Sequence, residues 1–235
     1  REEILDALEA VFSPKAIVIR YDACEDRILE RASIRVPELA RGSEPGLPEC
    51  KTKSGFVFTA DPLAQGWTTG AFFAEHKLRE LLDQSLTVTE GASSTISSRE
   101  NKRGAGPKQV PEKRPLQVLS LFGESSGIYA AWKGAKVTCA LLESEAKESA
   151  SALELLAARN QCHKDDIAYV TLGEEPRFDE LGSQYKSQFD IVTLEPPALA
   201  PTYGKLEEGA RLYTAWSALA ATACRPGGLL LVACR

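Results

Sequence analysis

The sequence contains no methionine, only two histidines, and no uninterrupted apolar run of the roughly 18 residues that can span a bilayer. The shortage of histidine, and six cysteines that never form a C-x-x-C pair, argue against a metal site. The missing apolar run argues against insertion into a membrane. Because it has no methionine and begins at Arg1, we interpret the sequence as the observed part of a longer polypeptide.

Charge and cysteine usage narrow the class of protein further. A formal net charge of −5 and a pI near 5.3 argue against a protein that coats nucleic acid by bulk electrostatics, although a local basic patch could still bind RNA. The cysteines are scattered and several stand in apolar segments, which indicates reduced thiols in an intracellular compartment. They are Cys24, Cys50, Cys139, Cys162, Cys224 and Cys234.

The most informative stretch is residues 116–143, whose pattern predicts the opening β-α-β unit of a nucleotide-type α/β fold. Apolar runs separated by a Gly/Ser turn and a Gly134 stop favour two buried parallel strands joined by a helix. The expected elements are a strand over 116–122, a turn over 123–127, a helix over 128–132 and a strand over 136–142.

The turn in this unit is a candidate ligand site. Small residues there let a ligand reach backbone N–H groups, and an acid after the second strand, Glu143, can accept from ribose hydroxyls. Gly123 and Gly127 alone do not complete the G-x-G-x-x-G pattern of dinucleotide sites, so S-adenosylmethionine is the better candidate. The alternative is that the turn is ordinary parallel-sheet structure.

The remaining segments alternate between strand and helix, which predicts a mainly parallel sheet with helices on both faces. Ligands of such sheets bind at the carboxyl ends of the strands. Downstream, we expect a helix over 145–160, strands over 167–172 and 188–194, a helix over 205–224, a turn over 225–228 and a strand over 229–234. Upstream, we expect a helix over 2–12, a strand over 16–20, a loop over 37–54, a strand over 56–60 and a helix over 71–82.

These patterns divide the chain into three parts. Residues 1–83 form a small α/β domain, and residues 116–235 form the domain with the parallel sheet. Residues 84–115 have low complexity and few apolar side chains, so we expect a flexible insertion or linker. Its lysines and arginines could contact RNA phosphates, or the segment could be a solvated disordered loop.

Five motifs in this order resemble the class I S-adenosylmethionine-dependent RNA methyltransferases, and most closely the bacterial large-subunit rRNA 5-methylcytosine methyltransferases. The chain begins with REEILDALEAVFSPKAIVIRYDA, similar to the small central domain of that family. QGWTTGAFFAEHKLR is similar to its G-Q-K-T-G-F-F-x-D-Q-R-x-N-R stretch, and LFGESSGIYAA to its L-F-x-Y-T-G-G-x-x-x-A-A cofactor loop. FDIVTLEPPALA and PGGLLLVACR resemble F-D-x-I-x-x-D-P-P-x-F and P-G-G-x-L-x-x-x-S-C-S.

The resemblance implies a Rossmann-like methyltransferase domain, with a small α/β domain in front, and a set of site residues. Glu143 would hold the cofactor ribose, and Glu174 would lie near the adenine. Glu195 would face the target base with the two prolines after it, and Cys234 would be the thiolate that adds to C6 of a flipped-out cytosine. The turn that would wrap the methionine part of the cofactor is formed by Phe122, Gly123, Ser125 and Gly127, and the prolines are Pro196 and Pro197.

The sequence also departs from the family pattern in ways that weaken catalysis. The acid of the D-P-P motif is Glu195, one methylene longer than aspartate, which shifts a carboxylate enough to spoil a preorganised site. An ungapped count from the Gly-Gly turn places the family nucleophile on Arg235 instead of Cys234, and Cys234 could equally be a small buried hydrophobe. The given sequence does not include the hairpin that normally follows the last strand of this fold, so we expect the domain to be C-terminally incomplete.

Two hypotheses for function follow. In the first, the chain is a degenerate methyltransferase-like protein that serves as a structural or assembly component of a ribonucleoprotein, with an organellar ribosome such as that of the mitochondrion as the expected place. In the second, it is an active S-adenosylmethionine-dependent rRNA cytosine methyltransferase. Both predict ribosomal RNA and ribonucleoprotein proteins as partners, and the altered motifs favour the first.

Overall fold

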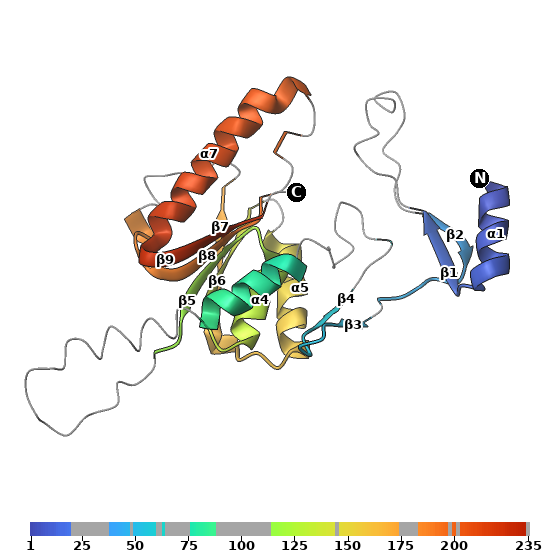
Figure 1. Cartoon of the computed structure of the whole chain (residues 1–235), viewed down its shortest axis with the longest axis horizontal. Helices are drawn as coiled ribbons and strands as arrows, with labels where there is room; N and C mark the ends of the chain where they lie inside the picture. Colours follow the sequence, from blue (N-terminus) through green and yellow to red (C-terminus); the bar gives the residue numbers. More distant parts are fainter. Residues whose placement is uncertain are drawn as a thin grey trace, which may run out of the picture. The chain divides into compact units, whose positions relative to one another are not determined.

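The computed structural model describes residues 1–19, 38–47, 49–59, 63, 76–87, 114–143, 146–173, 183–196, 199–200 and 203–233. Within it the chain forms two compact units, residues 1–72 and 73–235, whose elements are labelled in Figure 1. No helix in these described stretches has the length and apolar character needed to cross a membrane.

The described residues of the first unit form one helix and two antiparallel strand pairs. Helix α1 (Glu2–Phe12) begins with acidic residues, which the helix macrodipole favours at that end, and it ends at Ser13, whose backbone is left-handed. Arg41 contacts three acids of this helix and thereby lowers the pKa of Glu2 through a hydrogen bond and its charge. The strand pairs are β1 (Ala16–Ile19) with β2 (Glu38–Gly42) and β3 (Glu49–Lys51) with β4 (Val57–Thr59).

The expected loop over 37–54 was wrong, because β2 and β3 lie within it. Neither strand has an alternating apolar pattern, and each is formed instead by pairing with a neighbour. In addition, Gly42 has a positive φ of 82° and lies so close to the backbone of Lys15 that a side chain would collide with it. Strands that depend on pairing in this way leave little signal in the local sequence.

The second unit is built on a five-stranded sheet in the order β7-β6-β5-β8-β9, with every pair parallel. This confirms the expectation of a mainly parallel sheet, and the chain is an α/β protein with a Rossmann-like sheet. All six residues of β8, the fourth strand in this order, are buried. The strands are β5 (Gln117–Leu121), β6 (Lys136–Leu142), β7 (Ile167–Leu172), β8 (Phe189–Leu194) and β9 (Cys224–Val232).

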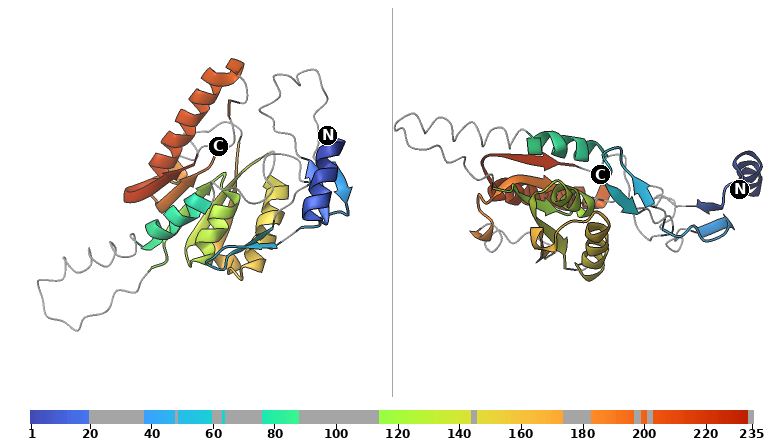
Figure 2. Two further views of the ribbon diagram at one scale, coloured as in Figure 1. Left: turned by 45° about the vertical axis from the view of Figure 1, so that its right-hand side comes forward. Right: turned by 90° about the horizontal axis from the view of Figure 1, so that it is seen from below.

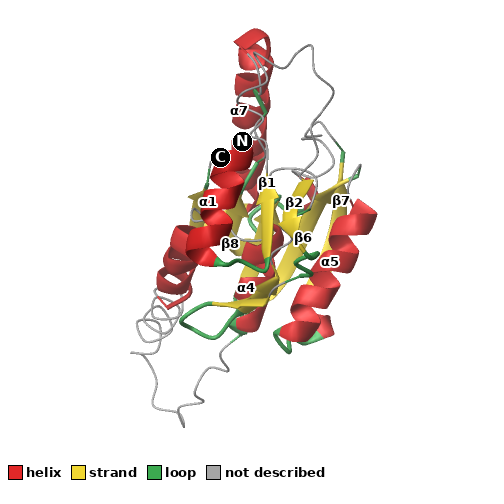
Figure 3. Ribbon diagram, turned by 90° about the vertical axis from the view of Figure 1, so that its right-hand side faces the viewer, coloured by secondary structure: helices red, strands yellow, loops and turns green. Residues whose placement is uncertain are grey.

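Helices cover both faces of this sheet, and Figure 3 shows its strands between α7 and α5. On one face, Trp216 and its neighbours in α7 (Leu206–Ala223) pack against alternate strand residues such as Leu119 and Val192. The other face carries α4 (Glu124–Trp132), which contacts β5, β6 and α5 (Ala146–Arg159). A helix over residues 76–87 (Figure 2) is joined to α4 by hydrogen bonds to Asp83 from Tyr129, at 2.8 Å, and an ion pair with Lys133.

Two expected boundaries were wrong in this unit. The helix predicted over 128–132 begins at Glu124, so most of the expected turn is its first helical turn. The helix expected to end at residue 82 continues to residue 87, into the segment 84–115. Local patterns place helix ends poorly because the first and last turns carry few of the apolar residues that define the period.

Strand β9 begins at Cys224 and not after the Arg-Pro-Gly-Gly run, so the expected turn over 225–228 was also wrong. The pairing of Phe189 with Cys224 and of Ile191 with Leu229 makes these residues a bulge opposite Asp190. The bulge brings Arg225 within 2.5 Å of the Asp190 carboxylate, which is fully buried. Arg114 contacts the same carboxylate oxygen at 2.8 Å, and the Gln117 N–H donates to the other oxygen at 2.8 Å.

We predict that Asp190→Ala lowers the free energy of unfolding by about 3 kcal/mol, because it leaves a buried N–H and two guanidinium groups without their shared acceptor. Urea denaturation measures the loss. The control Glu154→Ala removes an exposed carboxylate of α5 and should change stability by less than about 0.5 kcal/mol. Equal losses in the two variants would contradict the role assigned to Asp190.

Candidate functional site

The carboxyl ends of β5 and β8 bring the predicted turn and the predicted acid together. The Glu195 N–H donates to the carbonyl of Leu121 at 2.9 Å, which places Glu195 directly beside the turn that follows β5. Its side chain is 3% exposed and accepts a hydrogen bond of 2.5 Å from the Ser126 hydroxyl in the first turn of α4. The acid therefore points into the sheet edge and not toward solvent.

The contact between Ser126 and Glu195 is part of a cluster of buried hydroxyl groups. Ser120 donates to the Gly123 carbonyl at 2.7 Å, and Thr193 donates to Ser120 at 3.2 Å. The Ser126 oxygen lies 3.2 Å from that of Ser120 and 3.4 Å from that of Thr193. All three hydroxyl side chains are at most 2% exposed. The Glu195 carboxyl group thus belongs to an internal hydrogen-bond network, as a buried polar group requires.

Glycine at position 123 makes room for this acid. A Cβ placed on Gly123 would lie 2.0 Å from the nearer carboxylate oxygen of Glu195 and 2.4 Å from the Ser126 oxygen. The space that a small residue leaves beside the turn is therefore filled by the chain's own carboxylate. A side chain at position 127 would also collide with its surroundings, because a Cβ there would lie 2.7 Å from the Cys139 sulfur under α4.

This arrangement does not fit a cofactor wrapped around the turn. Such a ligand must approach the backbone of Gly123, and the Glu195 side chain is already packed against that residue. Displacing it would break the 2.5 Å contact with Ser126 and leave that hydroxyl with the Gly123 carbonyl, at 3.2 Å, as its acceptor.

The other predicted site residues have different surroundings. Phe122 has a positive φ of 60° and packs edge to face on Trp216, with ring centroids 4.7 Å apart. Glu143 is exposed after β6, and its N–H donates to the Leu172 carbonyl at 2.8 Å. Ser125 is half-buried in α4, and Pro196 is buried directly after Glu195. Cys234, Glu174 and Pro197 lie outside the described residues.

The fold brings two further residues to this edge that the sequence pattern did not identify as site residues. Ser126 is the direct hydrogen-bond partner of Glu195. The sequence feature that could have identified it is the second of the two serines that follow Gly123. Arg79, in the helix over residues 76–87, is only 5% exposed, and its guanidinium lies 3.5 Å from the Ser125 oxygen. An arginine on the apolar side of a helix was the available signal, since a buried cation needs polar neighbours.

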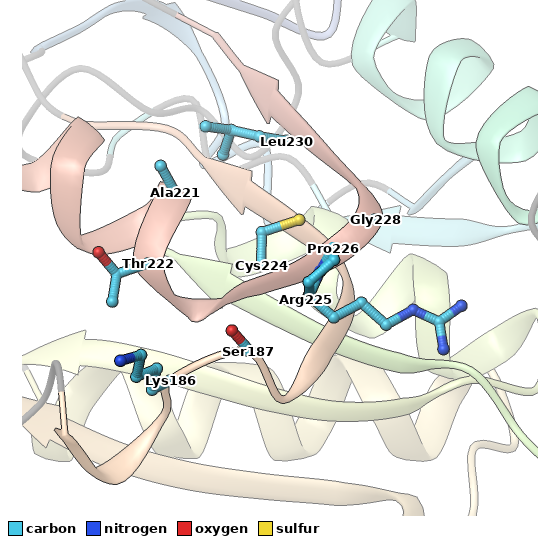
Figure 4. Close-up of a pocket in the computed structure, with 9 residues that line it drawn as sticks. All are labelled: Lys186, Ser187, Ala221, Thr222, Cys224, Arg225, Pro226, Gly228 and Leu230. Carbon is cyan, nitrogen blue, oxygen red and sulfur yellow. The ribbon is translucent and has the colours of Figure 1, made fainter.

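A groove of about 530 Å³ lies at the opposite, amino-terminal edge of the sheet, between β9, the end of α7 and the residues before β8. Figure 4 shows Cys224 in its centre, with Lys186 and Arg225 on opposite sides of it. Burial raises the pKa of the Cys224 thiol above its ordinary value, so this thiol is a weak nucleophile at neutral pH. Across the described stretches, no three metal-binding side chains gather in one place.

We predict that Gly123→Ala destabilises the protein by about 2 kcal/mol, because its methyl group displaces the buried Glu195 carboxylate. In a Glu195→Ala background the same change should cost less by about 1 kcal/mol, which a double-mutant cycle with urea denaturation measures. Gly204→Ala is the control, because a Cβ there meets nothing within 4 Å. An identical cost of Gly123→Ala in both backgrounds would contradict the proposed packing.

No model of a protein family matches the sequence, and a search of curated proteins returns no match. Among solved structures, the chain is similar to a universal stress protein in complex with cAMP, with 16% sequence identity and a TM-score of 0.34. The alignment covers 51% of this chain and 98% of that one.

Proposed function

We propose that this chain is a degenerate methyltransferase-like protein that acts as a structural or assembly component of a ribonucleoprotein. The observation that carries the proposal is the Glu195 carboxylate packed against Gly123 and hydrogen-bonded to Ser126. An enzyme must keep the cofactor space open until the cofactor arrives. Here the longer acid at that position fills the space and accepts a hydrogen bond from the buried Ser126 hydroxyl.

The energetics support a closed site. Burying a carboxyl group costs less when its oxygens are hydrogen-bonded, and the Ser126 contact of 2.5 Å supplies such a bond to one oxygen from within the chain. A cofactor would have to replace this internal contact as well as provide its own. Part of its binding energy would therefore be lost in displacing the acid.

The order of the sheet is compatible with the class I methyltransferase fold that the motifs suggest. In this proposal β5 and α4 correspond to the cofactor loop, and Glu195 with Pro196 to the motif that faces the base. The protein retains the fold for the surfaces it presents to RNA and proteins, and we place it in an organellar ribosome such as the mitochondrial one. The active rRNA cytosine methyltransferase is the alternative that the tests below address.

We predict that the full-length protein gives no binding signal with S-adenosylmethionine or S-adenosylhomocysteine in calorimetric titration at concentrations up to about 1 mM. Glu195→Ala removes the side chain that fills the space, so this variant should gain weak binding, with a Kd on the order of 1 mM. Micromolar binding by the unaltered protein would refute the proposal. Methyl transfer to rRNA that is lost in Cys234→Ala would then establish the enzyme.

The structural role makes a second, independent prediction. In a sucrose gradient of an organelle lysate, the tagged full-length protein should sediment with ribosomal particles and move to the top after ribonuclease treatment. The physical reason is that assembly through RNA contacts depends on intact RNA. Sedimentation as a free protein in the untreated lysate would rule out stable residence in a ribonucleoprotein.

A further inference from the structure

A cation stands at the amino-terminal end of every strand of the parallel sheet. Lys136 is the first residue of β6, Arg225 is the second residue of β9, and Lys164 opens the short helical turn that leads into β7. Arg114 and Lys186 each stand three residues before the first residue of their strands, β5 and β8. Because neighbouring strands are about 4.8 Å apart, these five residues span roughly 20 Å along one edge of the sheet.

This edge carries an excess of positive charge in a protein that is acidic as a whole. Its connecting segments, residues 114–116, 132–136, 159–166, 183–190 and 222–226, contain seven lysines and arginines. The acids at this edge are Asp165, Asp166 and Asp190 of the same segments, and Asp83, which forms an ion pair with Lys133. The described part of this edge therefore has three more positive than negative charges, whereas the whole chain has a net charge of −5.

Three of these cations are available to a partner. Lys136, Lys164 and Lys186 are exposed, and among the described residues none of them forms an ion pair with a carboxylate. The ordinary explanation for such residues is that cations stabilise the C-termini of helices, which end at this edge. That explanation accounts for Arg159 and Lys133 at the ends of α5 and α4, and for Lys186, which follows the helical residues 183–184. It does not account for Lys136, four residues beyond α4, or for Lys164, which begins a short helical turn.

The opposite edge has the reverse charge. At the carboxyl ends of the strands and the start of α7, the described acids are Glu143, Glu195, Glu207 and Glu208, against Arg79 and Lys205. A polyanion is therefore attracted to the amino-terminal edge and repelled from the edge that holds the closed site. The groove beside Cys224 lies on the attractive edge, flanked by Lys186 and Arg225 as Figure 4 shows.

We infer that the amino-terminal edge of the sheet, defined by Arg114, Lys136, Lys164, Lys186 and Arg225, is an RNA-binding surface that contacts the phosphate backbone. The inference rests on the proposed role in a ribonucleoprotein and assigns the surface through which that role is carried out. The exposed Lys136, Lys164 and Lys186 can each neutralise one phosphate, while Arg114 and Arg225 are also paired with Asp190. Contacts of this kind position the RNA and carry no sequence preference.

The test is fluorescence anisotropy with a labelled single-stranded RNA of about 20 nucleotides, titrated at several salt concentrations. The triple variant Lys136→Glu, Lys164→Glu, Lys186→Glu should lose at least about tenfold in affinity, and the slope of log K against log salt should become shallower by about 2. The matched control is Lys15→Glu, Lys53→Glu, Lys205→Glu, which reverses three exposed lysines that are not among the five residues defining this surface and changes the net charge equally. The control should lose less than about threefold in affinity, and thermal melts should show that both triple variants are folded.

Equal losses in the two triple variants would overturn the inference, because bulk charge alone would then explain binding. Tighter binding of the unaltered protein to polyglutamate or to anionic lipid vesicles than to RNA would also overturn it. These outcomes leave the closed site untouched. Conversely, micromolar S-adenosylmethionine binding would refute the non-catalytic role. A larger loss of RNA affinity in the first triple variant than in the control would still assign the RNA surface in that case.

Discussion

Strand β8 carries a buried carboxylate at each end, and the need to satisfy both acids shapes the second unit. At the amino-terminal end, Asp190 joins Arg114, the start of β5 and the bulge of β9. At the carboxyl end, Glu195 joins the first turn of α4 through Ser126. Each carboxyl group is buried by the sheet, and neighbouring elements supply its hydrogen bonds. These contacts hold β8 beside β5 and β9 and hold the Glu195 side chain against α4.

The two edges of the sheet are consequently different in chemistry. At the carboxyl edge, Glu195 turns inward against Gly123, so the position where a Rossmann-like sheet usually receives its ligand is filled by the chain itself. At the amino-terminal edge, exposed lysines precede or begin the strands, and this is where a polyanion would be attracted. A fold of this kind can lose its ligand and keep a partner surface, because the two depend on opposite ends of the same strands.

Much of the second unit could be predicted because its elements are long and strongly patterned. The apolar runs around Val118 and Val192 indicated buried parallel strands, and the alanine-rich pattern before Cys224 indicated α7. The strands β2 and β3 could not be predicted, because backbone pairing forms them and not an apolar period. The start of α4 and the bulge at Arg225 were also missed, since a Gly/Ser run and an Arg-Pro-Gly-Gly run look like turns locally.

The sequence by itself determined the fold class and the elements that meet at the candidate site, because strand and helix periods are local properties of the chain. It placed Gly123 and Glu195 after the carboxyl ends of two predicted parallel strands, and the structure made those strands neighbours. Only the tertiary structure decided that the Glu195 side chain turns into the space beside Gly123 and finds Ser126 there. The direction of a side chain depends on the hydrogen-bond partners that packing brings within reach, and these come from residues distant in the chain.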